Sequence, residues 1–370
     1  MTDRLEPTIE GDFTLPSDAP FRLVNGDILP SVTQRYAIYG NVAPRRDNVI
    51  LVCHALSGSA RVHDWWPQLF GRHRSFDLTR YAILGVNVLG SCYGSTGPSS
   101  INPATGERYG GSFPVVSIHD MVHAQARLAE HLNIERFHAV VGGSIGGMQA
   151  LAWATEYPER VPRCVAVGAC PLPTLGLALS HLQRQAIRND PAFLGGDFSP
   201  HAPPTAGLSL ARAIAMITYK SPELLEHRFG RKHDRSGEDP STSQTGRFDI
   251  GGYLDYQGRT FCNRFDANSY LAVTRAMELF EIGESPDEEA RLLSRIRART
   301  LLVGIRSDWM FPPRDIRALA YRMAAIGVDA RYAEMESAHG HDGFLADSHE
   351  LEPLLRPILE EEPVPVAEQA

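Results

Sequence analysis

The chain has 370 residues, of which 43% are hydrophobic, and a formal net charge of −8. This length and apolarity allow a large buried core, in one domain with an insertion or in two domains. Interspersed charges argue against nucleic acid or an anionic membrane as partner, and no apolar run approaches the roughly 18 residues of a membrane span or resembles a signal peptide.

Five cysteines without a C-x-x-C pair do not indicate a disulfide framework. Cys53, Cys164 and Cys170 lie in apolar, strand-like segments, where a buried thiol behaves as a small hydrophobe. We therefore expect a cytoplasmic protein with reduced thiols.

The chain alternates strand-like and helical segments. Polar residues 1–20 predict a loosely held N-terminal arm, and residues 21–40 alternate enough to predict two antiparallel strands at a sheet edge. Helical segments, such as 118–132 and 313–325, separate later apolar runs. The pattern predicts an α/β fold, a mostly parallel sheet with helices on both faces. The predicted buried strands are residues 48–53, 81–88, 137–141, 163–168, 299–305 and 330–335.

Residues 172–295 differ in character from the chain on either side, because they hold several helical segments and no long β-branched run. We interpret them as a helical cap inserted into an α/β catalytic domain of residues 21–171 and 296–360. A closing helix is predicted at 349–359, and residues 361–370 are expected to form a flexible tail.

Ser144 stands in a G-x-S-x-G run, Gly142-Gly143-Ser144-Ile145-Gly146, between a predicted strand and a predicted helix at 145–157. A strand, a sharp turn and a helix in this order expose the serine at the tip of a strained turn, where neighbouring side chains must be small. We therefore predict that Ser144 is a nucleophile rather than an incidental serine in a glycine-rich turn.

A serine hydroxyl needs a base that takes its proton and a third group that orients the base. Asp308 and His341 each follow a predicted strand of the parallel sheet, so they fall at the same sheet edge as Ser144. The order serine, acid, histidine is that of α/β-hydrolases. Asp315, in a predicted helix, is a weaker candidate acid, and His339 stays open as an alternative base.

Acyl chemistry also needs two N–H donors for the oxyanion of the tetrahedral intermediate. The backbone of Ile145, directly after the serine, is one predicted donor, and the backbone of Leu56, in the loop after residues 48–53, is the other. His119 and His123 have metal-like H-x-x-x-H spacing, but the glutamate of H-E-x-x-H and an evident third ligand are missing. We therefore predict no metal site.

Several blocks in one order carry a resemblance that extends over residues 20–360. They are HALSG at 54–58, NVLGSCYGSTGP at 87–98, GGSIGGMQ at 142–149, RQAI at 184–187, YQG at 256–258, RFDANSY at 264–270 and GHD at 340–342. On these blocks the chain resembles the homoserine O-acyltransferases of the α/β-hydrolase fold, and the homoserine O-acetyltransferases in particular.

The resemblance implies a two-step transfer in methionine biosynthesis. Ser144 would take an acyl group from acyl-CoA and pass it to the side-chain hydroxyl of an amino acid, commonly homoserine. His341 resembles the family's base, which decides against His339, and Asp308 resembles its acid. CoA would be a substrate, so no bound cofactor is expected, and a homodimer formed through the cap is implied.

The resemblance also assigns substrate contacts. Arg184 would hold the substrate carboxylate, Asp342 the substrate ammonium, and Tyr256 would line the pocket. Met310 stands where many succinyl-using relatives have an arginine, and a carboxylate buried against methionine would be unstable, so acetyl is the expected donor group. A succinyl donor remains the alternative.

Serine remains an alternative acceptor, because it differs from homoserine by one methylene, worth only about 1–3 kcal/mol in a fitted pocket. An ester hydrolase would share the serine, acid and histidine but would not need the clamp of Arg184 and Asp342. A non-catalytic member of the fold would be expected to lack one of the three residues, and none is missing.

Overall fold

The computed structural model describes residues 4–16, 20–234 and 238–360, so the tail predicted at 361–370 lies outside it. Its central element is an eight-stranded sheet in the order β1-β4-β6-β5-β7-β8-β9-β10. The pairs β1–β4 and β4–β6 are antiparallel and the other pairs are parallel. The strands are β1 (Ile9–Thr14), β4 (Thr33–Tyr39), β5 (Val49–Cys53), β6 (Ala82–Val86), β7 (Ala139–Gly143), β8 (Arg163–Val167), β9 (Arg299–Ile305) and β10 (Ala330–Met335).

The N-terminal edge of the sheet differs from the prediction. The segment expected to be a loose arm contains β1, and residues 21–40 supply β4 together with a separate two-stranded sheet of β2 (Phe21–Arg22) and β3 (Ile28–Leu29). An edge strand such as β1 buries little of either face, so its sequence lacks the apolar alternation that identifies a strand.

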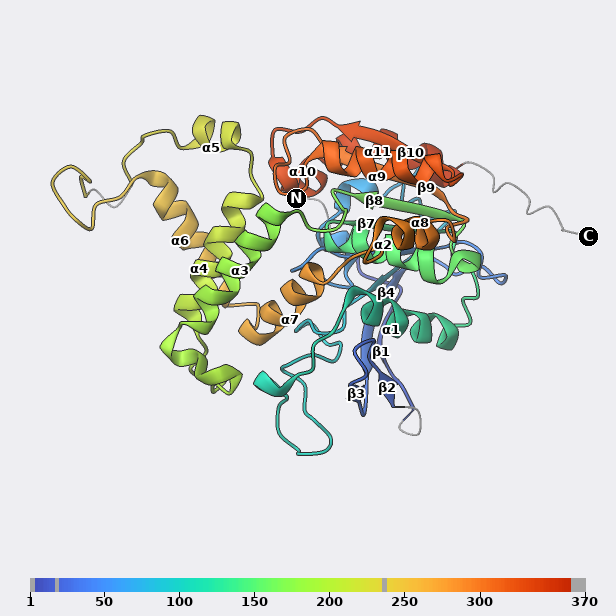
Figure 1. Cartoon of the computed structure of the whole chain (residues 1–370), viewed down its shortest axis with the longest axis horizontal. Coiled ribbons are helices and arrows are strands. Elements are labelled where there is room, and N and C mark those ends of the chain that lie inside the picture. Colours follow the sequence, from blue (N-terminus) through green and yellow to red (C-terminus); the bar gives the residue numbers. More distant parts are fainter. Residues whose placement is uncertain (1–3, 17–19, 235–237, 361–370) are drawn as a thin grey trace, which may run out of the picture.

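Helices cover both faces of the sheet, which confirms the predicted fold class (Figure 1). On one face lie α1 (Ile118–His131), α2 (Ile145–Glu156) and α9 (Pro313–Ala325). The other face packs against α11 (Ser348–Glu360), which the short α10 (Gly343–Ala346) precedes. Successive side chains of a strand point to opposite faces, so each central strand contributes to both apolar clusters.

The chain between β8 and β9 is helical, as predicted for residues 172–295. In Figure 1 most of these helices extend to the left of the sheet, where α4 packs against both α3 and α6. The last helix, α8, instead packs against α9 of the α/β domain. The segment between β8 and β9 therefore returns to the α/β domain before residue 295, the predicted end of the cap. The helices are α3 (Thr174–Arg188), α4 (Thr205–Thr218), α5 (Pro222–Arg228), α6 (Asp249–Cys262), α7 (Ala267–Glu278) and α8 (Pro286–Leu293).

Among the residues that the structure describes, none of the helices combines the length and the apolarity that crossing a bilayer requires.

Candidate active site

Ser144 occupies a strained turn between β7 and α2. Its backbone has φ 58° and ψ −128°, in a region that residues with a side chain rarely adopt. The flanking glycines are required by close packing: a Cβ on Gly142 would lie 2.1 Å from the Gly146 carbonyl oxygen, and a Cβ on Gly146 would lie 2.1 Å from the Cys53 carbonyl oxygen. The fold therefore presents the serine at the carboxyl end of the parallel strands.

The structure brings the predicted serine, histidine and aspartate into one hydrogen-bonded chain. His341 Nε2 lies 2.8 Å from Ser144 Oγ, and His341 Nδ1 lies 2.6 Å from Asp308 Oδ2. All three residues are buried, with exposed fractions of 7% for Ser144, 2% for His341 and 3% for Asp308. This arrangement can pass a proton from the serine to an oriented imidazole.

The two alternative residues lie elsewhere. His339 Nδ1 is 2.7 Å from Asp347, in a pair that does not include the serine. Asp315 lies in the first turn of α9, where it pairs with Arg314. Neither has a hydrogen bond to Ser144 among the described residues.

Asp308 is held in place by the backbone. Its Oδ1 accepts hydrogen bonds from the amides of Met310 and Phe311, each at 2.9 Å, which leaves Oδ2 for the histidine. Burial lowers the pKa of His341, but the charge and hydrogen bond of Asp308, together with the charge of Asp342, outweigh burial and raise the pKa above 6.5. The imidazole is thus a stronger base than a free histidine.

The two predicted oxyanion donors lie at adjoining parts of the backbone. Ile145 is the first residue of α2, and Leu56 lines the same cavity as Ser144. Within the described residues, neither amide donates a hydrogen bond, so both remain available. The contact of Gly146 with the end of β5 brings the first turn of α2 against the loop that contains Leu56.

His54 organises that loop. Its Nδ1 lies 2.7 Å from the Ala55 carbonyl oxygen, and its Nε2 accepts a hydrogen bond from the Val88 amide at 3.1 Å. Burial lowers the pKa of His54 to about 4, so this imidazole is neutral. Sequence patterns gave it no role beyond packing.

Above Ser144 lies a cavity of about 230 Å³ that carries charges of both signs. Arg212, on α4, has a buried Nε without a hydrogen-bond partner among the described residues, and its guanidinium lies 4.7 Å from the Phe261 ring centroid. Sequence reasoning missed Arg212, although a lone cation in the apolar run of α4 was an available signal. The lining residues are Ala55, Leu56, Ser57, Gly58, Trp65, Ser144, Arg212, Tyr219, Arg264, His341, Asp342, Phe344 and Leu345.

Two further charged residues line this cavity. Asp342 Oδ2 accepts a hydrogen bond from Lys220 Nζ at 2.8 Å, and no such partner is present for Oδ1 in the described chain. Arg264 donates to Tyr93 Oη at 2.6 Å and to the Ser57 carbonyl oxygen at 3.1 Å. The cavity thus offers cations and a carboxylate to a small zwitterion.

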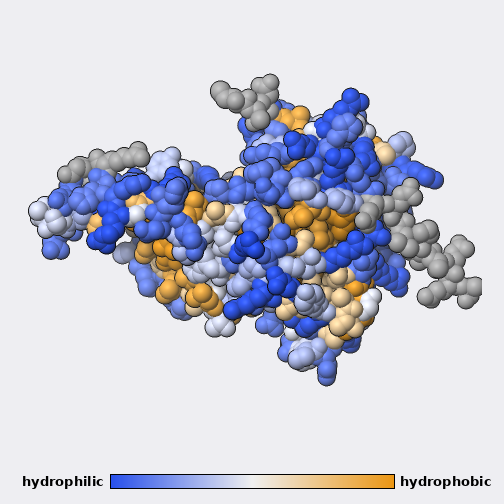
Figure 2. Space-filling model, turned by 90° about the horizontal axis from the view of Figure 1, so that it is seen from above, coloured by the Kyte–Doolittle hydropathy of each residue, from blue (hydrophilic) through white to orange (hydrophobic). Residues whose placement is uncertain are grey.

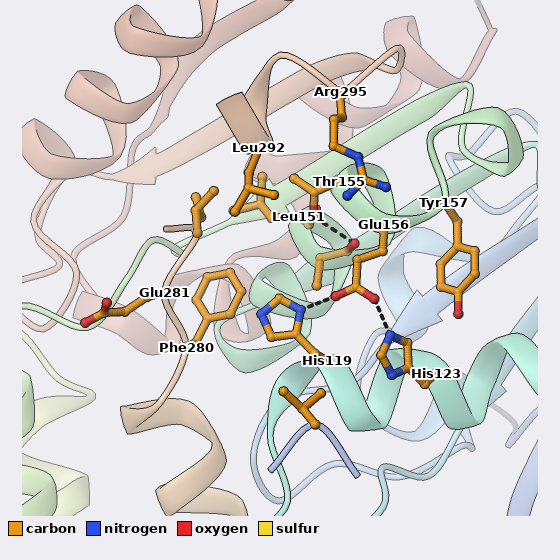
Figure 3. A pocket seen from close by; sticks show the side chains of 13 residues that line it. His119, His123, Leu151, Thr155, Glu156, Tyr157, Phe280, Glu281, Leu292 and Arg295 are labelled. Atoms are coloured by element: carbon orange, nitrogen blue, oxygen red, sulfur yellow. Dashed lines mark hydrogen bonds and ion pairs between the residues drawn. The ribbon is translucent and has the colours of Figure 1, made fainter. Parts of the chain in front are cut away.

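The histidines of the H-x-x-x-H motif lie in a different pocket, formed by α1, α2 and the segment around Phe280 (Figure 3). His119 Nδ1 and His123 Nε2 each contact a different carboxylate oxygen of Glu156. No group of three potential ligands in the described residues is arranged to hold a metal ion.

Comparison with known proteins places these features in a family. Residues 48–334 match the alpha/beta hydrolase fold family. A homoserine O-acetyltransferase of Symbiobacterium thermophilum is 44% identical over 92% of this chain and 92% of its own length. The chain belongs to the homoserine O-acyltransferase family. A homoserine O-succinyltransferase of Bordetella petrii, 42% identical over 89% of this chain and 81% of its own length, is a further relative.

Solved structures of the family and its neighbours have the same fold. The homoserine O-acetyltransferase of Bacillus anthracis aligns with a TM-score of 0.90 at 27% identity, covering 97% of this chain and all of that one. Esterase E22 aligns with a TM-score of 0.87 at 26% identity, covering 95% of this chain and all of that one. Acyltransferases and an esterase therefore share this architecture.

Two assignments based on the family resemblance need correction, and a third stays a prediction. Arg184 is absent from the lining of the Ser144 cavity: its Nε donates to Glu278 at 2.8 Å, and it lines another cavity. Tyr256 is 58% exposed on α6 and does not line the Ser144 cavity either. Met310 is buried in the core, and its amide rather than its side chain bonds to Asp308, so the selectivity attributed to it stays a prediction without a contact.

Proposed function

We propose that the protein transfers an acetyl group from acetyl-CoA to the side-chain hydroxyl of L-homoserine through an acetyl-Ser144 intermediate. The observation that carries this proposal is the hydrogen-bonded chain of Ser144, His341 and Asp308 at a cavity lined by Arg212 and Asp342, whose Nε and Oδ1 atoms have no hydrogen-bond partner in the described part of the chain. Family membership supports the reaction class.

In the first step, Ser144 Oγ attacks the thioester carbonyl carbon while His341 Nε2 takes the hydroxyl proton. The amides of Leu56 and Ile145 donate hydrogen bonds to the oxyanion of the tetrahedral intermediate. The carbon–sulfur bond then breaks, and the imidazolium returns the proton to the CoA sulfur. Asp308 keeps Nδ1–H oriented and stabilises the positive imidazolium.

In the second step, homoserine replaces CoA, and its hydroxyl loses a proton to His341 Nε2 and attacks the acetyl carbon on Ser144. The bond between Ser144 Oγ and the acetyl carbon then breaks, and the imidazolium returns the proton to Ser144 Oγ, which releases O-acetylhomoserine and restores the free serine. Arg212 would bind the homoserine carboxylate, since its guanidinium faces the cavity and a planar fork suits a carboxylate. Oδ1 of Asp342 would accept the ammonium, because Lys220 occupies Oδ2. The clamp predicted for Arg184 and Asp342 is thus reassigned to Arg212 and Asp342.

A succinyl donor is the second candidate, and one observation favours it. Arg264 also lines the cavity, so a second guanidinium is available for the free carboxylate of a succinyl group. Relatives of similar identity carry the acetyltransferase and the succinyltransferase names, so identity alone does not separate the two donors. Acetyl remains our choice, because Arg264 already has two hydrogen-bond acceptors.

A homodimer in the cytoplasm is part of the same proposal. The helices that extend from the sheet carry hydrophobic residues on their surface (Figure 2), and an exposed apolar surface of this kind favours contact with a second protein surface. Replacing Leu182 by aspartate should shift the protein toward monomer in size-exclusion chromatography. The exposed residues are Leu175, Leu177 and Leu182 on α3 and Leu210 and Ile217 on α4.

The test is a matrix of purified protein with acetyl-CoA or succinyl-CoA and with homoserine, serine or no acceptor, followed by thiol release. We expect release that requires acetyl-CoA and homoserine and that is lost in Ser144→Ala. Faster turnover with succinyl-CoA would make Arg264 the donor-selecting residue. Release without an acceptor, at the same rate, would make the protein a hydrolase.

A further inference from the structure

A second cavity, about 360 Å³ in volume, lies between α3, α7 and the loop around Gly110. Its wall contains three arginines, namely Arg184 and Arg188 on α3 and Arg275 on α7. The volume falls in the range of small-molecule sites, roughly 300–1,000 Å³. A concentration of guanidinium groups in one concave site is typical of recognition of phosphate or carboxylate groups.

The positive charge in this cavity is only partly neutralised. Glu278 pairs with both Arg184, at 2.8 Å, and Arg275, at 2.9 Å. Arg188 has no ion pair or hydrogen bond from its side chain within the described residues. Three guanidinium groups are thus matched by one paired carboxylate, Glu278, which contacts two of them, and a further carboxylate, Asp197, accepts a hydrogen bond from the Gly111 amide at 3.4 Å.

Arg184 supplies the buried part of the site. Its side chain is only 8% exposed, and its Nε is the one guanidinium nitrogen for which the described chain provides a hydrogen-bond acceptor. The guanidinium lines the cavity, and among the described residues its terminal N–H groups have no hydrogen-bond acceptor. These N–H groups are therefore available to an anionic ligand, which a guanidinium can bind through two parallel hydrogen bonds.

The opposite wall consists of backbone and flat side chains. A Cβ on Gly111 would lie 2.3 Å from the Gly195 carbonyl oxygen, so the two segments can approach only because residue 111 is glycine. Phe113 and Phe193 line the same cavity. Aromatic rings beside guanidinium groups provide stacking surfaces for a nucleobase and cations for its phosphates.

Two chain segments run from the walls of this cavity to the walls of the Ser144 cavity. Tyr93 bonds to Arg264, which lines the Ser144 cavity, and five residues later Pro98 lines the arginine cavity. Helix α7 begins just after Arg264 and reaches Arg275 after a rise of about 12 Å. A ligand with a long flexible arm between a thioester and a phosphorylated group could occupy both cavities.

We propose that the arginine cavity binds the phosphorylated adenosine end of CoA, with its phosphates on Arg184, Arg188 and Arg275. This inference rests on the proposed function, because that function makes an acyl-CoA the donor. The pantetheine arm would then run along the loop of residues 93–98 toward Ser144, and the adenine would lie against Phe113 or Phe193.

The direct test is calorimetric titration with adenosine 3′,5′-bisphosphate, which lacks the pantetheine arm and the thioester. We expect binding to the unmodified protein, a weakening of about tenfold or more in Arg188→Glu, and a similar loss in Arg275→Gln, which leaves Glu278 paired with Arg184. Arg127→Glu, a change to a half-exposed arginine on α1, is the matched control and should bind normally.

Kinetics with two donors provide the second test. In Arg188→Glu, KM for acetyl-CoA should rise about tenfold, while kcat/KM for S-acetylpantetheine, which has no nucleotide, should stay within twofold of the unmodified protein. Normal bisphosphate binding and normal acetyl-CoA kinetics in both arginine variants would overturn the inference and leave the proposed function intact. Failure of both donors to acylate Ser144 would overturn the proposed function, and the titration would still decide whether the cavity binds a nucleotide.

Discussion

Two regions of this molecule place histidines against a carboxylate, at opposite ends of one helix. Ser144 precedes the first residue of α2 and Glu156 is its last residue, so the rise of the helix separates them by about 18 Å. At the first end, His341 lies between Asp308 and Ser144. At the other end, His119 and His123 share Glu156 (Figure 3).

The two clusters differ in the partner of the imidazole nitrogen that does not bind the carboxylate. His341 has an acid on Nδ1 and a hydroxyl on Nε2, so a proton can move from the hydroxyl to the ring. Around Glu156, burial opposes the charged form, but the hydrogen bonds from His119 and His123 outweigh burial and lower the pKa of the carboxyl to about 2. Among the described residues, neither imidazole of the second cluster contacts a hydroxyl, so this cluster holds a carboxylate without a nucleophile, whereas the strained turn presents Ser144 to His341.

The largest expected effect comes from removing the nucleophile. Ser144→Ala should lower kcat by roughly 10³- to 10⁶-fold, because the acyl group then has no covalent carrier. Glu156→Gln, the matching change at the other end of α2, should leave kcat within about twofold. Steady-state thiol release measures both, and an equal loss in the two variants would contradict the distinction between the clusters.

Removing the acid of the triad, Asp308, should have the second-largest effect. Asp308→Asn keeps the shape of the side chain but cannot stabilise the imidazolium, so kcat should fall by roughly 10³- to 10⁴-fold. The pKa of His341 is raised above 6.5, so the unmodified enzyme should lose activity as the pH falls through a value above 6.5. In the variant this acid limb should move to lower pH. A pH–rate profile with an unmoved limb would show that Asp308 does not set the basicity of His341.

The substrate clamp should give a smaller loss. Arg212→Leu should lower kcat/KM for homoserine by roughly 10²-fold, since the substrate carboxylate would lose its charged partner in the Ser144 cavity. Tyr256→Phe is the control: this side chain is 58% exposed, and its change should alter kcat/KM for homoserine less than twofold. Varying homoserine at saturating acetyl-CoA separates this effect from donor binding. A normal kcat/KM in Arg212→Leu would show that a residue other than Arg212 binds the substrate carboxylate.

The smallest effect concerns stability and belongs to the second cluster. Glu156→Gln should lower the free energy of unfolding by about 1–2 kcal/mol, because two partly buried hydrogen bonds to the carboxylate are weakened and solvent screens part of their strength. Because the pKa of Glu156 is lowered, its contribution to stability is fully present above about pH 4.5 and is lost as the pH falls toward 2. The raised pKa of His119, due first to its hydrogen bond with Glu156, makes its contribution present below 6.5 and lost as the pH rises beyond its raised pKa.

The difference in free energy of unfolding between Glu156→Gln and the unmodified protein should therefore be greatest between about pH 4.5 and 6.5. Urea unfolding of both proteins at several pH values measures this difference. A difference that does not vary with pH would indicate lost packing rather than a lost ion pair.

Sequence patterns predicted the parts of the molecule that local chemistry determines. The central strands are buried on both faces, so their sequences are continuous apolar runs, and the positions after β7, β9 and β10 identified Ser144, Asp308 and His341. β1 was missed because an edge strand has little apolar alternation. The fold class is therefore predictable, but its polar edge is not.

The error over the substrate arginine has a tertiary cause. Arg184 and Arg212 lie on α3 and α4, two helices that pack against each other, and local sequence does not indicate which helix faces the sheet edge at Ser144. Resemblance to a short motif selected Arg184, whereas the fold turns Arg212 toward the serine. Pairing of helices in a cap depends on contacts far apart in the chain, which periodicity does not report.

The most direct test of the account is the mass of the intact protein after mixing with acetyl-CoA in the absence of an acceptor. The account predicts a gain of one acetyl group in the unmodified protein, no gain in Ser144→Ala, and loss of the group when homoserine is added, with O-acetylhomoserine as product. Product formation without any acetylated protein, or the same acetylation in Ser144→Ala, would contradict the central claim that Ser144 carries the acyl group.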